Sequence, residues 1–196
     1  MQSPPARGLR ADARRSKAAV LDAALQMLDA QPEAGMEAIA AAAGVTRQTV
    51  YAHFRSREQL LAAVADRIAE DVVAAMDAAD PHTGPAADAV LRLLDAGEQA
   101  ARRYPALLQK ISTLPVSLQA DREQHASVAD RITQVVRRGQ RTGELDDRLP
   151  ADWLATVVIG LAHSASGELE AGRMSGPEAK QVLHTSVLRM LGVATP

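Results

Sequence analysis

The residues best suited to chemistry in this sequence form a short polar run at 46–49 (Thr-Arg-Gln-Thr), with Tyr51 and His53 just beyond it. Most of these side chains donate hydrogen bonds. An arginine can bridge O6 and N7 of guanine, a glutamine can pair with adenine, and threonine or tyrosine hydroxyls can reach phosphate oxygens. The run therefore favours contact with double-stranded DNA.

Two short helices joined by a tight turn would position this run. One apolar stripe at i, i+3, i+4 and i+7 predicts the first helix, with Met36, Ile39, Ala40 and Ala43 on its inner face. Gly44 can close that helix in the left-handed conformation, and Val45 can fill the corner. The second helix, over about 46–54, would bury Val50 and Phe54 and leave the polar run outside.

A helix of this size fits the major groove of DNA, with the preceding helix bracing it across the backbone. The alternative is an ordinary helical hairpin with a polar outer face. On that interpretation Arg47 is a free surface charge, the Tyr51 ring packs on the first helix and His53 is a solvated imidazole.

The stretch GVTRQTVYAHFRSREQLLAAV (44–64), with the helix VLDAALQML (20–28) before it, resembles the signature of the TetR family of bacterial transcriptional regulators. The motif match covers roughly residues 14–64, and the rest matches by length and helical pattern only. The resemblance implies an all-helical homodimer. Each protomer would have an N-terminal three-helix DNA-binding domain and a larger domain that dimerises and holds an inducer pocket.

The resemblance also implies roles for individual residues. Arg47, Gln48 and Thr49 would approach base edges and the nearby backbone. Thr46, Tyr51 and His53 would bind phosphates. Arg57 stands at the position of a family lysine, at the start of the fourth helix. Ser56-x-x-Gln59 is a capping box that opens the helix carrying Arg57, so two sources of positive potential coincide there.

Two features depart from the family pattern. The linker from Leu28 to Met36 is about two residues shorter than the common form and carries Pro32 and Gly35. Glu37 stands where the family often has a residue able to contact phosphate, and a carboxylate close to DNA would repel it. We expect Glu37 to turn away from the DNA, or affinity for the operator to suffer.

We predict an all-α fold of about nine helices in two domains. Residues 1–12 would be a basic flexible tail, 13–58 the helix-turn-helix DNA-binding domain, and 59–196 the helical ligand-binding and dimerisation domain. The tail that leads into the first helix carries a basic cluster: Arg7, Arg10, Arg14, Arg15 and Lys17. It either follows phosphates or enters a minor groove, or it is disordered and merely solvated.

Composition narrows the class of protein. The formal charge of −2 divides unevenly, with eight Lys or Arg against six Asp or Glu up to Leu60, and 14 against 18 after it. A basic segment up to Leu60, followed by an acidic remainder, would orient the molecule on DNA. The absence of cysteine excludes disulfides, thiol redox sensing and thiolate metal sites in this chain. The five histidines show no metal-ligand spacing and no catalytic constellation, so we expect no metal, no cofactor and no enzyme activity.

No apolar run approaches the ~18 residues of a membrane span, which predicts a cytoplasmic protein without a membrane partner. After the predicted DNA-binding domain, prolines and glycines separate four predicted helices. They cover about 60–80, about 86–103, a short segment that ends at Pro115, and about 120–141. Two further helices carry wide apolar stripes that can form half of a four-helix dimer interface. Its predicted members are Trp153, Leu154, Val157, Leu161, Val182, Leu183, Val187 and Met190; alternatively both stripes fill the protomer core.

The sequence names no effector. The residues that could line a ligand pocket are Tyr104, His125, Trp153 and His163. Each can equally be a core or surface residue. The interpretation is a ligand-responsive, sequence-specific regulator, most simply a repressor released from a palindromic DNA operator by an unidentified small molecule. The alternative is a constitutive or architectural DNA-binding protein without an effector. A helical enzyme would need a nucleophile, an acid-base pair or a metal cluster, and the sequence offers none.

Overall fold

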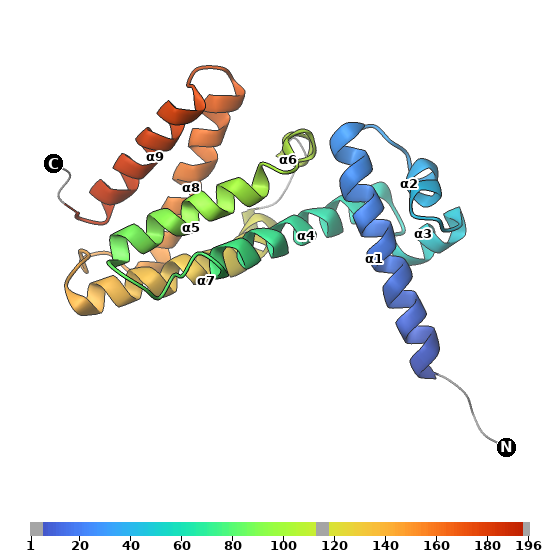
Figure 1. The fold of residues 1–196 in the computed structure, drawn as a ribbon, viewed down its shortest axis with the longest axis horizontal. Helices are drawn as coiled ribbons and strands as arrows, with labels where there is room; N and C mark the ends of the chain where they lie inside the picture. Colours follow the sequence, from blue (N-terminus) through green and yellow to red (C-terminus); the bar gives the residue numbers. More distant parts are fainter. Residues whose placement is uncertain (1–5, 113–117, 194–196) are drawn as a thin grey trace. The chain divides into compact units, whose positions relative to one another are not determined.

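The computed structural model describes residues 6–112 and 118–193, and within these ranges it contains nine α-helices and no strand. The all-α prediction is confirmed. Figure 1 shows the helices in chain order. Their bounds are α1 Ala6–Ala30, α2 Met36–Ala42, α3 Arg47–His53, α4 Arg57–Asp77, α5 Ala86–Ala101, α6 Pro105–Ser112, α7 Leu118–Thr142, α8 Ala151–Glu170 and α9 Gly176–Met190.

The helices divide into two compact units. Unit 1 contains α1, α2, α3, the part of α4 up to Ile68, and the segment from Ala101 that includes α6. Unit 2 contains the rest of α4 from Ala69, α5, and everything from α7 onward. This division differs from the sequence-based boundary at residue 58, because the first half of α4 and all of α6 belong with the N-terminal helices.

The core of unit 1 holds the α2–α3 hairpin in place. The α1 side chains Val20, Ala24 and Leu28 are fully buried, and Leu60 and Val64 of α4 are equally buried. The three α1 residues lie at i, i+4 and i+8, and the two α4 residues lie at i and i+4. This spacing puts side chains on one face of a helix. The α2–α3 pair packs on α1, and α4 adds buried side chains to the core of the same unit.

Helix α6 packs against α1, and two polar contacts fix it there. The Leu107 N–H donates to Asp29 Oδ1 at 3.4 Å, and the Leu107 side chain is fully buried. Lys110 Nζ donates to Glu33 Oε1 at 2.7 Å, which lowers the pKa of the Glu33 carboxyl. The linker after α1 is thus held by a helix about 75 residues further along the chain.

Unit 2 has its own apolar core, to which α7, α8 and α9 contribute as consecutively packed helices (Figure 1). Fully buried members include Leu93 of α5, Val136 of α7 and Val158 of α8. The predicted capping box at the start of α9 is present in both halves, since Ser175 accepts from the Glu178 N–H and Glu178 accepts from the Ser175 N–H.

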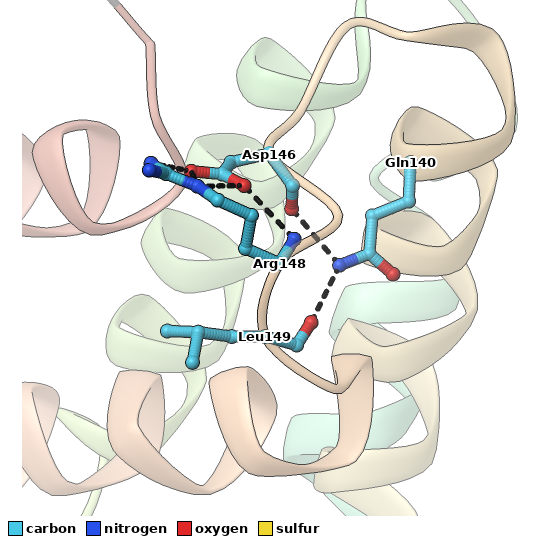
Figure 2. A network of polar contacts seen from close by, with 4 residues as sticks. All are labelled: Gln140, Asp146, Arg148 and Leu149. Carbon is cyan, nitrogen blue, oxygen red and sulfur yellow. Dashed lines mark hydrogen bonds and ion pairs between the residues drawn. The ribbon is translucent and has the colours of Figure 1, made fainter.

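A polar network orders the loop between α7 and α8 (Figure 2). Gln140 Nε2 donates to the carbonyls of Asp146 and Leu149, at 3.0 and 2.9 Å. Arg148 donates from Nε and from its N–H to the Asp146 carboxylate, and the guanidinium contact is the main reason that the pKa of Asp146 falls to about 2. The Asp146 N–H in turn donates to the Leu191 carbonyl at 3.0 Å, so this loop also ties down the end of α9.

One boundary expected from the sequence differs in the structure, and another lies outside the described residues. Helix α1 begins at Ala6, so the expected flexible tail of residues 1–12 is helical from that residue on. Pro115, predicted to end the short sixth helix, lies outside the described residues. None of the helices in the described ranges is both long enough and apolar enough to cross a membrane.

Candidate DNA-binding surface

The turn between α2 and α3 has the geometry that the sequence predicted. Met36, Ile39 and Ala40 are buried on the inner face of α2. Gly44 adopts φ +66°, a left-handed conformation that glycine takes without a steric penalty. The Val45 N–H donates back to the Ala40 carbonyl at 3.0 Å, which closes the turn. Only the four residues 43–46 therefore separate α2 from α3.

Thr46 caps helix α3. Its Oγ1 accepts from the Thr49 N–H at 3.1 Å and lies 2.9 Å from Thr49 Oγ1. A threonine cap satisfies one of the unpaired N–H groups of the first turn. Val50 and Phe54 are buried beneath the helix, while Thr46, Arg47 and Gln48 are exposed above it. The polar run thus lies on the outer face of a capped and anchored helix.

Arg47 lies between two partners on this face. Its guanidinium carbon is 5.4 Å from the centre of the Tyr51 ring, one turn further along α3. On the other side its Nη1 is 3.8 Å from Glu37 Oε2 on α2. Tyr51 is 39% exposed. Glu37 thus lies within ion-pair distance of Arg47, and its effect on affinity for an operator stays a prediction.

His53 joins the end of α3 to α1. Its Nε2 lies 2.7 Å from Ser16 Oγ, and the ring is half-buried beside Phe54. Lys17 Nζ lies 5.8 Å from the Phe54 ring centre, above the same junction. A phosphate contact by His53 would have to use Nδ1, because Nε2 is engaged with the serine.

Arg57 closes the short linker between α1 and α2. Its guanidinium donates to the Pro32 carbonyl at 2.5 Å and to the Ala34 carbonyl. The guanidinium is thus partly engaged and not fully free for a phosphate. The neighbouring capping box forms in a modified way: Ser56 Oγ accepts from the Gln59 N–H, but Gln59 Oε1 accepts from the Arg55 N–H and not from that of Ser56.

The predicted ligand-pocket residues fall into separate places. Tyr104 belongs to unit 1, whereas the other three belong to unit 2. His125 of α7 and His163 of α8 do meet, edge to face, with ring centres 4.9 Å apart. Trp153 is 57% exposed on α8, so in this protomer it does not line an interior wall. In the described part of the chain no three or more His, Asp or Glu side chains gather where they could hold a metal ion.

The predicted dimer residues are also divided. Val182 is 47% exposed and Trp153 still more, while Val157, Leu161, Leu183 and Met190 are half-buried. Leu154 and Val187 are fully buried in the core of unit 2. These last two are corrected from surface to core residues, because they occupy the side of their helices that packs within the protomer.

The contacts that join α3 to α1, and α4 to the linker between α1 and α2, were not predicted from the sequence. The Ser16–His53 and Arg57–linker hydrogen bonds join residues 37 and 23 to 25 positions apart. Neither has a local periodic signal. The short linker with its proline was the one available hint for Arg57, because an unusually short connection requires closer anchoring of its carbonyl groups.

Comparison with known proteins agrees with this architecture. Residues 20–64 match the profile of the bacterial regulatory proteins of the TetR family. The LfrR repressor of Mycolicibacterium smegmatis, described as an HTH-type transcriptional repressor, is 45% identical over 78 residues. That match covers 40% of this chain and only 41% of the length of LfrR.

Similarity to solved structures extends over almost the whole chain. The crystal structure of LfrR from Mycobacterium smegmatis in complex with proflavine has a TM-score of 0.61 and 28% identity, covering 93% of this chain and 98% of LfrR. RolR in complex with resorcinol has a TM-score of 0.76 over 93% of this chain and 90% of RolR, but at 20% identity it shows the fold alone. Members of the family are DNA-binding regulators and not enzymes. The chain thus has an N-terminal segment that matches the TetR family profile, and its fold is similar to that of the TetR-like regulator LfrR.

Proposed function

We propose that the protein is a sequence-specific transcriptional regulator, acting as a repressor on a palindromic DNA operator in the cytoplasm. One observation carries the proposal. Helix α3 is capped by Thr46 and anchored by the buried Val50 and Phe54, while its polar residues 46–48 are exposed on the opposite side. A helix anchored on one face and polar on the other can enter the major groove without unfolding its support.

Each side chain on this face has a role that its chemistry supports. Arg47 donates in bidentate fashion to guanine, and Gln48 pairs with adenine. Thr49 is half-buried and reaches a base edge or the adjacent backbone. The hydroxyls of Tyr51 and Thr46 donate hydrogen bonds to phosphates. His53 and Arg57 also bind phosphates, through those of their N–H groups that make no hydrogen bond within the protein.

The functional form is a homodimer that pairs through α8 and α9. The exposed Trp153 and Val182, with the half-buried Val157 and Leu161, form an apolar face on these helices. An added Cβ at Gly160 would meet nothing within 4 Å, so α8 has room for close approach of a second helix. A dimer that binds two half-sites on one face of the DNA needs its two α3 helices about 34–36 Å apart, the spacing of successive major grooves.

A small molecule regulates this dimer by population shift, with α4 as the lever because it runs through both units. The relative LfrR was crystallised in complex with proflavine. In this chain the single Phe and both Tyr lie in unit 1, and Trp153 is exposed. An effector in unit 2 is therefore held mainly by aliphatic side chains and the His125–His163 pair.

The test starts from a randomised duplex pool, from which the wild-type protein selects its preferred sequence. Fluorescence anisotropy then compares the selected duplex with a scrambled one at two salt concentrations. A regulator prefers the selected duplex, and the preference survives added salt, because base contacts depend less on counterion release than phosphate contacts do. A pool that enriches nothing, with equal and salt-labile binding to both duplexes, would favour the architectural alternative and overturn the proposal.

A further inference from the structure

The Glu37–Arg47 pair places a carboxylate on the surface that is proposed to face DNA. Both side chains are largely exposed, Arg47 at 62% and Glu37 at 83%, so neither is needed for the core. The carboxylate of Glu37 reaches the guanidinium from α2, while the Tyr51 ring holds it from α3. A negative charge at this position works against binding to any polyanion, which calls for a compensating gain.

We propose that Glu37 is a specificity-determining positioning residue, which holds the Arg47 guanidinium and so weakens binding to random DNA more than binding to the operator. The inference rests on the proposed DNA-binding function. On random DNA the only general partner for Arg47 is a phosphate, and Glu37 competes with that phosphate for the guanidinium.

On the operator the competition is weaker. A bidentate contact to guanine uses one edge of the guanidinium and leaves its other N–H groups for Glu37. The carboxylate can then stay in place and support the orientation that reads the base. A phosphate is an anion, so it competes with the Glu37 carboxylate for the guanidinium and is repelled by that carboxylate, whereas the neutral guanine edge is not. The pair therefore disfavours a phosphate contact more than a base contact.

The experiment uses Glu37→Gln in the full-length protein, on the duplex selected by the wild type and on its scrambled form, at about 50 and about 200 mM salt. Loss of the carboxylate should raise affinity for the scrambled duplex about two- to fivefold, the size of one exposed charge interaction. Affinity for the selected duplex should change less than about twofold, because its base contact keeps the pair. The ratio of the two affinities therefore falls.

Two controls separate positioning from simple charge. Asp66→Asn removes the same charge from an exposed site on α4, nine residues beyond Arg57. In an Arg47→Ala background, Glu37→Gln should raise binding to scrambled DNA no more than Asp66→Asn does in the wild type. If the full effect of Glu37→Gln persisted without Arg47, Glu37 would act by repelling phosphates and the positioning role would be overturned.

The remaining outcomes are also distinct. If the wild type enriches a sequence but Glu37→Gln leaves the affinity ratio unchanged, the role of Glu37 fails and the proposed function stands. If the wild type enriches no sequence, the proposed function fails and the inference fails with it.

Discussion

Arg47 is the residue on which sequence discrimination should depend most. Replacing it with Ala should cost about 1–3 kcal/mol of binding free energy on the selected duplex and little on the scrambled one, because a bidentate base contact is lost. Anisotropy titrations of both duplexes measure the difference. Arg14→Ala, an equally simple truncation at an exposed position on α1, should not change the ratio of the two affinities. Equal losses for Arg47→Ala on both duplexes would reassign Arg47 to the DNA backbone.

Asp146 gives the α7–α8 loop a pH-dependent contribution to stability. Its pKa is lowered from 3.8 to about 2, mainly by the Arg148 guanidinium, so the folded state favours the carboxylate. The stabilisation is complete above the unfolded pKa and is lost as pH falls through the folded one. Asp146→Asn should therefore lower the melting temperature at pH 6, and the gap from wild type should narrow between about pH 4 and pH 2.

Thermal unfolding followed by circular dichroism across that pH range checks this expectation. Asp147→Asn is the matched control, since it removes the same charge from the exposed neighbouring position. A gap for Asp146→Asn that stays constant down to pH 2 would show that the carboxylate has no special ionic role in the loop.

The residue scale also shows what local sequence can and cannot predict. The polar run at 46–49, the cap at Thr46 and the left-handed Gly44 all follow from short-range rules. The partners of Arg57 and His53 do not, because they depend on how distant helices meet. Glu37 was recognised as a departure from the family pattern, but its pairing with Arg47 depends on the side-chain directions of two helices.

At the scale of elements, Gly139 shows how closely α7 packs. An added Cβ there would lie 2.5 Å from Leu145 Cγ and 2.6 Å from Ala86 Cβ. Gly139→Ala should lower the free energy of unfolding by about 1–3 kcal/mol, the usual cost of overpacking, even after the gain in helix propensity. Chemical denaturation measures it.

The matched control is the same substitution at Gly167 in α8, where an added Cβ meets nothing within 4 Å. Gly167→Ala should stabilise the protein by about 0.5–1 kcal/mol, because only the backbone entropy of glycine is removed. If Gly139→Ala were as benign as Gly167→Ala, the contact between α7 and the start of α5 would be looser than the structure indicates.

Helix positions were largely predictable, because prolines, glycines and 3.6-residue periodicity mark them directly. The α9 start at Ser175 and the break before Pro105 both appear as expected. Which face of α8 is inside was not predictable. Its stripe is wide enough that Trp153 and Leu154 both fall in it, yet one is exposed and the other buried. The packing of α6 on α1 was missed because no local pattern reports a contact between segments so far apart.

At the scale of the whole molecule, the exposed apolar face of α8 and α9 requires an explanation, and the proposed dimer supplies one. Val182 has a 47% exposed side chain, so Val182→Glu should leave the protomer folded. In the dimer the new carboxylate would be buried without a partner, which is strongly unfavourable. Analytical ultracentrifugation should therefore find a dimer for the wild type and a monomer for the variant at the same concentration.

Operator binding gives an independent readout of the same substitution. A dimer binds two half-sites with one loss of translational freedom, whereas two monomers lose it twice, so Val182→Glu should weaken binding to the palindromic duplex far more than to a single half-site. Leu149→Glu is the control, because its side chain is 46% exposed but lies in the loop before α8, outside the predicted face. A wild type that sediments as a monomer, or a Val182→Glu variant that remains dimeric, would place the interface elsewhere.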